Sequence, residues 1–521
     1  MIIGGGHNGL VCGFYLARAG LKVRICEAHS EVGGAAVTEE FHPGYRNSVA
    51  SYTVSLLQPR VIAEMGLAER GLRVVNRPVA NFLPLSDKPG DYLVMGGGLA
   101  RTQAEVAKFS RKDAETLPAY FAALDRVADV LRALALTIPP RTEGVRGLID
   151  AALQSRALKD LDMAGRREAL ALFTRSASEY LDGWFESEPV KAAFGFDAVV
   201  GNYASPEAPG SAYVLLHHVF GEANGVKGAW GHAIGGMGAI TQAMASACRD
   251  AGVEIATSQP VAEVLVEKGA AIGVRLASGE VVRAKRVIAN VGPALLYRKL
   301  IARRELPDDF ARAIDLYATG SGSLRMNLAL SGLPRFAALP EPGEHLSAGI
   351  IMAPSLAYMD RAYEDARRAG WSREPIVEML IPSTVDESLV GTPGHHVASL
   401  FCQQFDPALE WTEPQEAQAA EAVLDVLERF APGMRDLIVG RQVLSPKGLE
   451  RRFGLVGGDI FHGRMSLDQL WAARPVLGHG SYRGPLKGLW MCGAGTHPGG
   501  GVTGAPGHNC AKAVLRNRRR L

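Results

Sequence analysis

Hydrophobic and polar positions along residues 2–27 predict a strand, a helix and a second strand in that order. Residues 2–3 are apolar and form the end of a first strand, which is shorter than the roughly five or six residues usual for a buried strand. The stretch LVCGFYLARAG follows with helical spacing and stops at Gly20, a residue type that commonly ends helices. In LKVRICE, apolar residues alternate with polar ones, as in a half-buried strand, at Leu21, Val23 and Ile25.

The same periodicities recur further along the chain. Residues 126–138 and 167–185 have helical spacing, and residues 322–330 alternate as in a strand. Residues 251–291 alternate apolar and polar positions between glycine turn signals and predict a β-meander. A chain of 521 residues with this mixture favours more than one domain, because single cores seldom exceed about 250–300 residues.

Glycines lie where the first strand meets its helix. Gly4, Gly6 and Gly9 have the spacing G-x-G-x-x-G, with His7 and Asn8 between them. In a dinucleotide-binding turn, the first glycine makes the turn, the second lets a pyrophosphate touch the backbone, and the third lets the helix pack on the strand. The N–H groups of the helix N-terminus attract the phosphates. Because strand, helix and second strand follow in the right order, we favour a nucleotide-binding start over an ordinary strand–turn–helix.

Two features after this unit indicate which nucleotide it binds. Glu27 ends the second strand roughly 20 residues after the glycines, where an acid hydrogen-bonds an unphosphorylated ribose, as in FAD or NAD. Gly33 and Gly34 then form a glycine pair that lets the loop pass close to the nucleotide. A plain NAD dehydrogenase has no need of such a pair, so we predict FAD.

A second glycine run lies near the end of the chain. A short apolar strand at residues 489–492 leads to Gly499, Gly501 and Gly504, and a helix follows. No further strand or ribose acid comes after it, so we do not expect a second nucleotide unit. We expect a helix N-terminus directed at the flavin, where its partial positive charge stabilises negative charge on the reduced ring.

The glycine turn, the stretch EAHSEVGGAAVTEEFHPGYRNSVASYTVSLL and three later blocks resemble the phytoene desaturase and amine oxidase superfamily of flavoproteins. The blocks are GGMGAITQAMASACRDAGVEI with the meander, GGDIFHGRMSLDQLWAARPV, and the C-terminal glycine run. Within the superfamily, the chain is most similar to the pyridine nucleotide-disulfide oxidoreductase domain-containing protein 2 subgroup. Related flavoproteins often carry an arginine directly after the glycine pair, where this chain has Ala35.

The resemblance implies further cofactor-binding residues. It places the backbone of Val261 at the adenine, and Gly493, Val502 and Thr503 beside the ribityl chain and flavin ring; Thr503 equally suits a helix N-cap. Amine oxidases of the superfamily attach their flavin to a cysteine within the C-terminal glycine segment. Residues 499–504 contain none, so the FAD is expected to be non-covalent.

Arg325 is the candidate catalytic residue that the resemblance offers. Family members often hold a lysine at this position, and in amine oxidases that lysine contacts water beside the flavin. Arginine is bulkier and does not act as a base at neutral pH, so Arg325 argues mildly against amine oxidation. The alternative is a surface or salt-bridged arginine on a strand.

The resemblance also implies the fold class. We expect an α/β protein with a Rossmann-type FAD-binding domain, of the glutathione-reductase-like, two-dinucleotide-binding variant, and an interleaved α+β substrate domain. The predicted FAD-binding domain comprises residues 1–70, 226–295 and 446–521, and the substrate domain residues 71–225 and 296–445.

Charge and hydropathy narrow the choice of partners and location. Lys and Arg number 56 against 54 Asp and Glu, a net charge of +2 that gives no argument for nucleic-acid binding. No apolar run reaches the ~18–20 residues of a membrane span. The basic tail RNRRRL is a solvated end or a weak attraction to anionic membranes. We expect a cytoplasmic protein with at most peripheral membrane contact.

Cysteine and histidine spacing argue against metal and disulfide chemistry. The six cysteines are scattered without a C-x-x-C, which favours buried thiols. The histidine pairs 217–218 and 395–396 are adjacent, so on a strand the two side chains would point to opposite faces. We therefore predict no metal site.

Together these features predict an FAD-dependent oxidoreductase, like a desaturase or dehydrogenase. The resemblance implies that it removes a hydride from a lipophilic substrate, an apolar polyene or aromatic molecule, and that oxygen, a quinone or another acceptor reoxidises the flavin. The alternatives are a redox-neutral flavin-dependent isomerase or saturase, an amine oxidase, and a non-catalytic FAD-binding scaffold.

Overall fold

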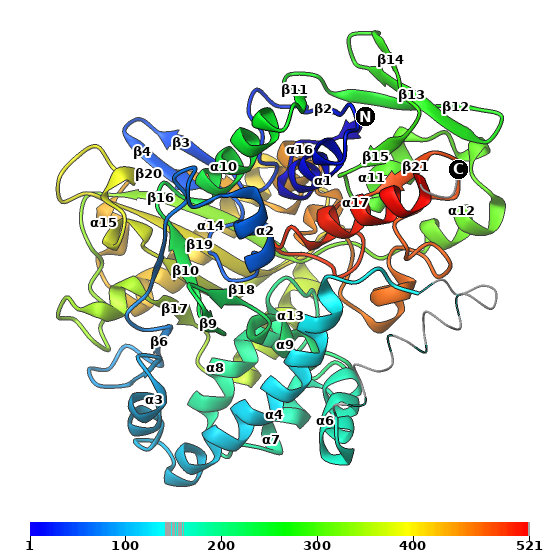
Figure 1. Cartoon of the computed structure of the whole chain (residues 1–521). Helices are drawn as coiled ribbons and strands as arrows, with labels where there is room; N and C mark the ends of the chain where they lie inside the picture. Colours follow the sequence, from blue (N-terminus) through cyan, green and yellow to red (C-terminus); the bar gives the residue numbers. More distant parts are fainter. Residues whose placement is uncertain (141–146, 148–151, 153, 155–158, 160, 519–521) are drawn as a thin grey trace.

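A computed structural model describes residues 1–140, 147, 152, 154, 159 and 161–518. The last three residues of the basic tail, 519–521, lie outside this range. Figure 1 shows a parallel sheet near the two termini, a larger sheet on the opposite side, and a group of helices below them. The structure is therefore mixed α/β, as predicted.

The parallel sheet joins the beginning, middle and end of the chain. Within the described residues its strand order is β11-β2-β1-β15-β21, and every neighbouring pair is parallel. The strands are β1 (Ile2–Ile3), β2 (Arg24–Cys26), β11 (Glu254–Ala256), β15 (Val287–Ala289) and β21 (Leu489–Met491). The short first strand is the central one, because Ile2 pairs with Ile25 on one side and Ile288 on the other.

Three helices pack together on this sheet: α1 (His7–Arg18), α10 (Met237–Asp250) and α17 (Ala505–Arg518). Glycines allow the close approach. A Cβ at Gly9 would lie 2.3 Å from the carbonyl oxygen of Gly4, and a Cβ at Gly507 would lie 2.2 Å from that of Asn8. The predicted first and last helices are confirmed.

The predicted meander is confirmed in its middle and wrong at its ends. The strands β12 (Val261–Glu267), β13 (Ala270–Leu276) and β14 (Val281–Arg283) form an antiparallel sheet. The flanking strands β11 and β15 belong to the parallel sheet instead. All three residues of β15 are buried, which is typical of a parallel strand covered on both faces.

The larger sheet has the order β20-β16-β19-β18-β17-β6-β7 in the described chain, antiparallel except between β17 and β6. Its strands are β6 (Asn81–Pro84), β7 (Tyr92–Met95), β16 (Ser323–Leu330), β17 (Gly349–Met352), β18 (Trp371–Leu380), β19 (His396–Phe405) and β20 (Ile438–Leu444). The strand predicted at residues 322–330 is confirmed as β16, and all eight of its residues are buried. Two-stranded pairs complete the sheets: β3 (Thr38–His42) with β4 (Tyr45–Ser48), β5 (Val74–Asn76) with β10 (Gly231–Ala233), and β8 (Glu222–Ala223) with β9 (Val226–Lys227).

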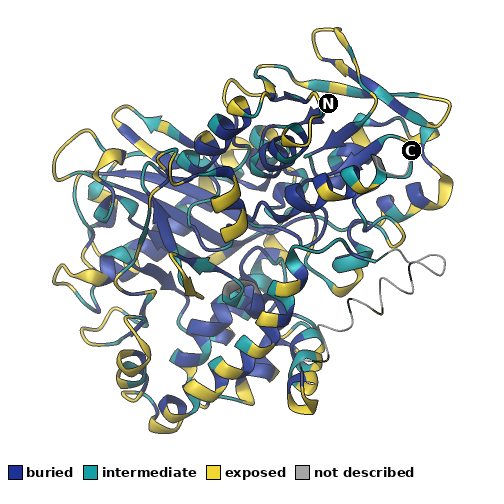
Figure 2. Ribbon diagram, in the orientation of Figure 1, coloured by how far each residue is buried: buried dark blue, intermediate teal, exposed yellow. Residues whose placement is uncertain are grey.

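Helices cover the lower part of the molecule in Figure 1, and their yellow outer faces in Figure 2 are exposed. The helix predicted at residues 126–138 is confirmed as the end of α4 (Arg111–Ala135). The helix predicted at 167–185 is wrong in its continuity, because α6 (Met163–Thr174) stops before α7 (Ala177–Asp182). Ser176 is the N-cap of α7 and forms a capping box with Glu179, which satisfies two backbone N–H groups at the start of the second helix.

Ten further α-helices lie in the described chain. They are α2 (Pro59–Met65), α3 (Leu99–Val106), α8 (Glu188–Val199), α9 (Tyr213–Val219), α11 (Pro293–Leu295), α12 (Asp308–Asp315), α13 (Leu356–Ala369), α14 (Glu413–Phe430), α15 (Met434–Leu437) and α16 (Pro446–Phe453). The expectation that residues 217–218 lie on a strand is wrong, since they fall within α9. No helix in the described ranges is long and apolar enough to cross a bilayer.

Candidate functional site

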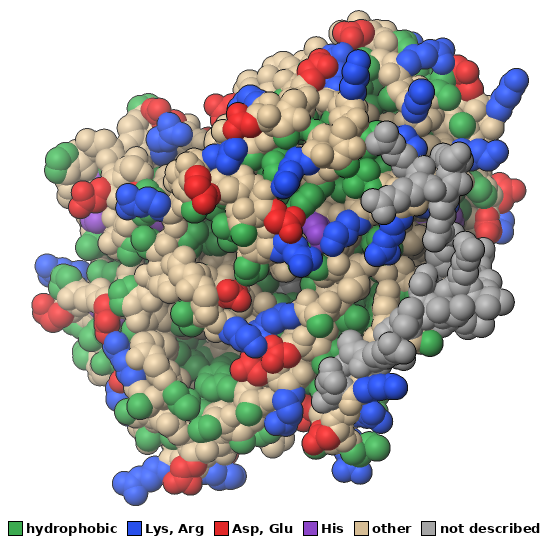
Figure 3. Space-filling model, in the orientation of Figure 1, with side chains coloured by type: hydrophobic (Ala, Val, Ile, Leu, Met, Phe, Trp, Pro, Cys, Tyr) green, Lys and Arg blue, Asp and Glu red, His purple; other side chains and the backbone are tan. Residues whose placement is uncertain are grey.

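A cavity of about 860 Å³ is lined by residues of both the parallel and the seven-stranded sheet. This volume is near the upper end of the ~300–1,000 Å³ typical of small-molecule pockets. Figure 3 shows the surface hollowed in the region of β9 and α8, with apolar side chains around the hollow. We call the part lined by the N-terminal glycines the glycine end, and the part lined by Tyr52, Arg77, Arg325 and Glu378 the arginine end.

The glycine end is built mainly from backbone. The helix α1 begins after Gly6 with no side-chain cap and no acidic residue in its first turn, so its first N–H groups are open to an anion. The loop of the glycine pair lies against this turn, because the Gly33 N–H donates to the Gly5 carbonyl at 3.0 Å. Gly33 and Gly34 both have positive φ, at 137° and 59°. The predicted residues that line this end are Gly4, Gly6, His7, Asn8, Glu27, Gly33, Gly34 and Ala35.

Glu27 supports the glycine turn as well as lining the cavity. Its Oε2 accepts from the Gly5 N–H at 2.7 Å, and its Oε1 accepts from the His29 N–H at 2.9 Å. Each carboxylate oxygen has a further lone pair, so both remain able to accept from a ribose hydroxyl. The sequence predicts only the second of these two roles.

Asn290 contributes to the glycine end and is absent from the sequence prediction. Its Nδ2 donates to the Gly4 carbonyl at 3.2 Å and lies 3.0 Å from where a Cβ of Gly6 would be. Asn290 directly follows β15, and ligands of α/β sheets bind beyond the carboxyl ends of the strands. That rule would have found Asn290 if β15 had been assigned to the parallel sheet.

The C-terminal glycine run reaches the same cavity. Gly501 and Val502 line it, as does Val261 from β12. Thr503 does not, but its Oγ1 accepts from the N–H of Ala505, the first residue of α17, at 3.1 Å. Two other predicted residues, Gly9 and Gly493, also lie outside the lining and serve close packing. A Cβ at Gly493 would lie 2.9 Å from the carbonyl oxygen of Asn290.

Two half-buried histidines, His7 and His462, line the cavity with neutral rings. Burial and the neighbouring His462 lower the pKa of His7 to about 4. Burial likewise lowers the pKa of His462 to about 4, although Asp459 opposes the shift. His7 Nε2, Asn8 Oδ1 and Ser55 Oγ are buried without a hydrogen-bond partner in the described structure, and all three residues line the cavity. Buried polar atoms are rarely left unpaired, so these atoms fit a polar ligand in the cavity.

Arg474 positions the loop that carries His462. It is fully buried, and its guanidinium donates to the Phe461, Gly463 and Ala494 carbonyls at 2.6, 3.2 and 3.0 Å. Phe461, His462 and Ala494 line the cavity. Arg474 stands in the block GGDIFHGRMSLDQLWAARPV that carries the family resemblance, but neither periodicity nor charge distinguishes it from a surface arginine.

At the arginine end, Arg325 is only 1% exposed. Its Nη1 donates to the Leu400 carbonyl at 2.6 Å, its Nη2 donates to Ser399 Oγ at 2.5 Å, and its guanidinium carbon lies 4.2 Å from the centre of the Tyr52 ring. The alternative of a surface or salt-bridged strand arginine is therefore wrong. The apolar alternation of β16 conceals the position, because the arginine lies between Leu324 and Met326.

Tyr52 and Glu378 complete the polar lining of this end. The Tyr52 hydroxyl donates to Glu378 Oε2. Burial raises the pKa of Glu378, partly offset by the Tyr52 hydrogen bond and by Arg77 and Arg325.

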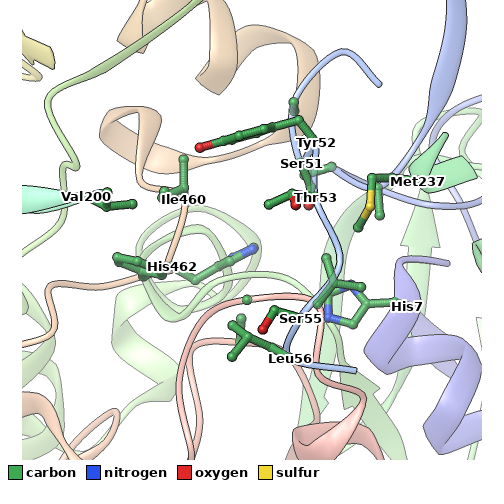
Figure 4. A pocket seen from close by; sticks show the side chains of 18 of the residues that line it. His7, Ser51, Tyr52, Thr53, Ser55, Leu56, Val200, Met237, Ile460 and His462 are labelled. Atoms are coloured by element: carbon green, nitrogen blue, oxygen red, sulfur yellow. The ribbon is translucent and has the colours of Figure 1, made fainter. Parts of the chain in front are cut away.

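The remaining walls are largely apolar. In Figure 4, Tyr52, Val200, Ile460 and His462 surround one part of the cavity, and His7 and Met237 lie at the other. Aromatic and aliphatic side chains from α4, α8 and α9 extend this lining, among them Tyr120, Phe121, Leu124, Phe194, Phe196, Leu215 and Val219.

Comparison with known proteins identifies the family. The family model described as flavin containing amine oxidoreductase matches residues 9–325. The chain belongs to this family. It is 39% identical to pyridine nucleotide-disulfide oxidoreductase domain-containing protein 2 of Rattus norvegicus over 100% of the chain and 94% of that relative. It is 24% identical to a phytoene desaturase (lycopene-forming) of Pseudescherichia vulneris over 99% and 98%. The solved structure of a putrescine oxidase bound to putrescine has the same fold, with a TM-score of 0.61 at 14% identity over 100% and 98% of the two chains.

The protein is thus a flavin-dependent oxidoreductase, and the residues of the cavity fit a flavin nucleotide. The uncapped α1 N-terminus, the two glycine loops in contact and the unpartnered polar atoms of His7, Asn8 and Ser55 lie together along one side of it. Within the described ranges, no three His, Cys, Asp or Glu side chains are grouped to hold a metal ion. All six cysteines are buried and unpaired, as the sequence predicts.

Proposed function

We propose that the protein binds FAD non-covalently in a Rossmann-type domain of the glutathione-reductase-like, two-dinucleotide-binding variant, and removes a hydride from an apolar, polyene or aromatic substrate. The observation that carries the proposal is the single cavity shared by the glycine end and the apolar walls. A cofactor at the first and a substrate at the second would occupy one continuous space.

The glycine end would hold the nucleotide. The open N–H groups of α1 suit the pyrophosphate, Glu27 suits the ribose, and Gly501 and Val502 lie in the loop that leads into α17. Bound FAD supplies a ring that accepts a hydride. Partial positive charge at the N-terminus of α17 would stabilise negative charge on a flavin bound beside it. No cysteine lies in the 499–504 segment, which supports non-covalent binding.

The protein would orient the substrate, exclude water and set the local charge for the reaction. The apolar walls orient a lipophilic substrate and exclude water. Their lowered pKa values leave His7 and His462 neutral at pH 7, so each can hold a hydrogen bond to the substrate without adding charge. Reoxidation by oxygen, a quinone or another acceptor completes the cycle.

Two named relatives bear on the substrate. The phytoene desaturase, by its name, acts on an apolar polyene, and the putrescine oxidase is bound to a cationic amine. Arg77 and Arg325 make the arginine end unfavourable for an ammonium group, so we propose desaturase-like rather than amine oxidase chemistry.

Anaerobic mixing of the purified flavoprotein with apolar polyene and aromatic compounds tests this function. Lasting loss of the flavin absorbance near the visible maximum, together with a product that has lost two hydrogens, is the expected result. Product without bleaching would instead establish a redox-neutral isomerase. Bleaching by amines alone would establish an amine oxidase, and a spectrum that no compound changes would favour a scaffold.

A further inference from the structure

Two guanidinium groups line the cavity without an acidic partner. Arg325 donates only to a carbonyl and a hydroxyl, and its buried Nε has no acceptor. Arg77 donates to Thr53 Oγ1 at 2.7 Å. Among the described residues, no carboxylate oxygen lies within the 4.0 Å of an ion pair with either arginine.

Glu378 is the carboxylate whose charge acts on both arginines. Glu378 accepts a hydrogen bond from the Tyr52 hydroxyl. Its single carboxylate interacts with the two guanidinium groups of Arg77 and Arg325. Asp197 also lines the cavity, but burial and the charge of Glu378 raise the pKa of Asp197 well above its usual range, which favours its uncharged form. Asp125 and Lys227, which line the cavity as well, carry opposite charges. The four residues that define the arginine end therefore include two guanidinium groups and one carboxylate, so the guanidinium groups outnumber the carboxylate by one.

A buried charge without a partner is unfavourable, and proteins rarely retain one without a ligand. A planar guanidinium matches the two oxygens of a carboxylate, and such charge-assisted hydrogen bonds are stronger than neutral ones. The additional guanidinium group therefore calls for one anionic group in the cavity.

We propose that the arginine end binds the carboxylate of the substrate, which is a monocarboxylate with an apolar chain or ring system. Arg77 and Arg325 hold the carboxylate, Glu378 and Tyr52 fix the arginines' surroundings, and the aromatic walls of α4 and α8 hold the apolar part. The phosphates of a dinucleotide have their own site at the α1 N-terminus, on the other sheet. This inference rests on the proposed function and specifies its substrate class.

Calorimetric titration of the purified holoprotein with dodecanoate, dodecan-1-ol and dodecylamine tests the charge preference at equal chain length. Dodecanoate should bind with one molecule per chain and shift the flavin spectrum. Its affinity should be at least about 10-fold higher than that of the alcohol, because a hydrogen bond to a charged group is stronger than a neutral one. The amine should bind most weakly. Equal or tighter binding of the alcohol or the amine overturns the proposal.

Variants assign the preference to the arginines. Arg77→Gln should weaken the binding of dodecanoate about 10-fold and leave the affinity for dodecan-1-ol unchanged. Arg73 is exposed and directly precedes β5, so Arg73→Gln is the matched control. This variant should change the affinity for neither dodecanoate nor dodecan-1-ol. Arg325→Lys keeps the charge but loses the planar fork, so it should lose less affinity than Arg325→Gln. If Arg325→Gln does not fold, Arg77→Gln and Arg325→Lys decide the outcome.

The flavin content of the same samples separates this inference from the proposed function. Loss of flavin in Arg77→Gln or Arg325→Lys would mean that the arginines hold the cofactor, and would overturn the carboxylate site. Wild-type protein that prefers dodecanoate but takes up no flavin would refute the proposed function and leave the carboxylate site standing.

Discussion

The glycine end and the arginine end of the cavity are built in different ways. The glycine end is made mainly of backbone from the first turn of α1 and two neighbouring loops, residues 4–6 and 33–35, and Glu27 and Asn290 hydrogen-bond to the first of these loops. The arginine end is made of side chains that come from residues 52, 77, 325 and 378, separated by up to 326 positions in the chain. One end depends on the absence of side chains, and the other on their presence.

This difference predicts which substitutions each end of the cavity tolerates. At the glycine end, an added side chain meets neighbouring backbone, as at Gly9, or enters the space of the cofactor, as at Gly6, so small substitutions should remove the fold or the cofactor. At the arginine end, substitutions of similar volume should leave the flavin in place and change only the choice of substrate. The predictions below test this contrast, beginning with the largest effect.

Gly9→Val should have the largest effect, because it prevents α1 from packing on β1. A Cβ at Gly9 would lie 2.3 Å from the Gly4 carbonyl oxygen and 2.9 Å from Asn290 Nδ2. We expect a loss of about 3 kcal/mol or more in the free energy of unfolding, seen as a lower melting temperature or as insoluble protein. Gly332→Ala, where a Cβ has an ordinary 3.6 Å contact, is the matched control. A Gly9 variant as stable as this control would contradict the predicted packing.

Gly6→Val should retain the fold and lose the cofactor. A Cβ there would meet only Asn290 Nδ2 at 3.0 Å within the protein, so the larger side chain would mainly fill the space of the pyrophosphate. A loss of about 3 kcal/mol corresponds to a ~100-fold weaker affinity for FAD. The ratio of visible to ultraviolet absorbance, measured beside Arg77→Gln, provides the comparison. Equal flavin content in the two variants would show that the two ends do not differ as described.

Glu27→Ala should have a smaller effect at the same end. The substitution leaves the Gly5 and His29 N–H groups without their acceptor and also removes the ribose partner. Each unpaired buried group costs about 1–3 kcal/mol, so both the melting temperature and the FAD affinity should fall. A fall in affinity alone would mean that Glu27 does not support the turn. Binding of FAD measured by fluorescence quenching, beside the melting temperature, distinguishes the two outcomes.

Acid pH should destabilise the protein through His7, His462 and His497. This destabilisation is absent at pH 7. Burial lowers the pKa values of His7, His462 and His497 to about 4, below their unfolded value of about 6.5. The unfolded state therefore binds more protons than the folded state between these values, and the free energy of unfolding should fall as the pH drops from about 6.5 to about 4.

His497→Gln should make this pH dependence shallower. Melting temperatures measured from pH 7 to pH 4.5 test the prediction, with the exposed His29→Gln as the control. If the His497 variant and the wild type lose stability in parallel, His497 is not a source of the effect.

The sequence could predict the glycine end but little of the arginine end. Gly4, Gly6, Gly9 and Glu27 have a fixed spacing because a single strand–helix–strand unit sets their geometry. Tyr52, Arg77 and Glu378 have no such spacing, since their meeting depends on how seven strands order themselves in space. Arg325 entered the prediction through a family resemblance, but its burial could not be foreseen from the strand's alternation.

The predicted domain boundaries and the cofactor roles of individual residues stay predictions. The most direct test of the central claim, that the glycine end holds FAD non-covalently, is the visible spectrum of the purified protein before and after acid precipitation. We predict a flavin spectrum whose chromophore passes into the supernatant and has the mass of FAD. Colourless protein that does not take up added FAD, or colour that stays with the precipitate, would contradict the account.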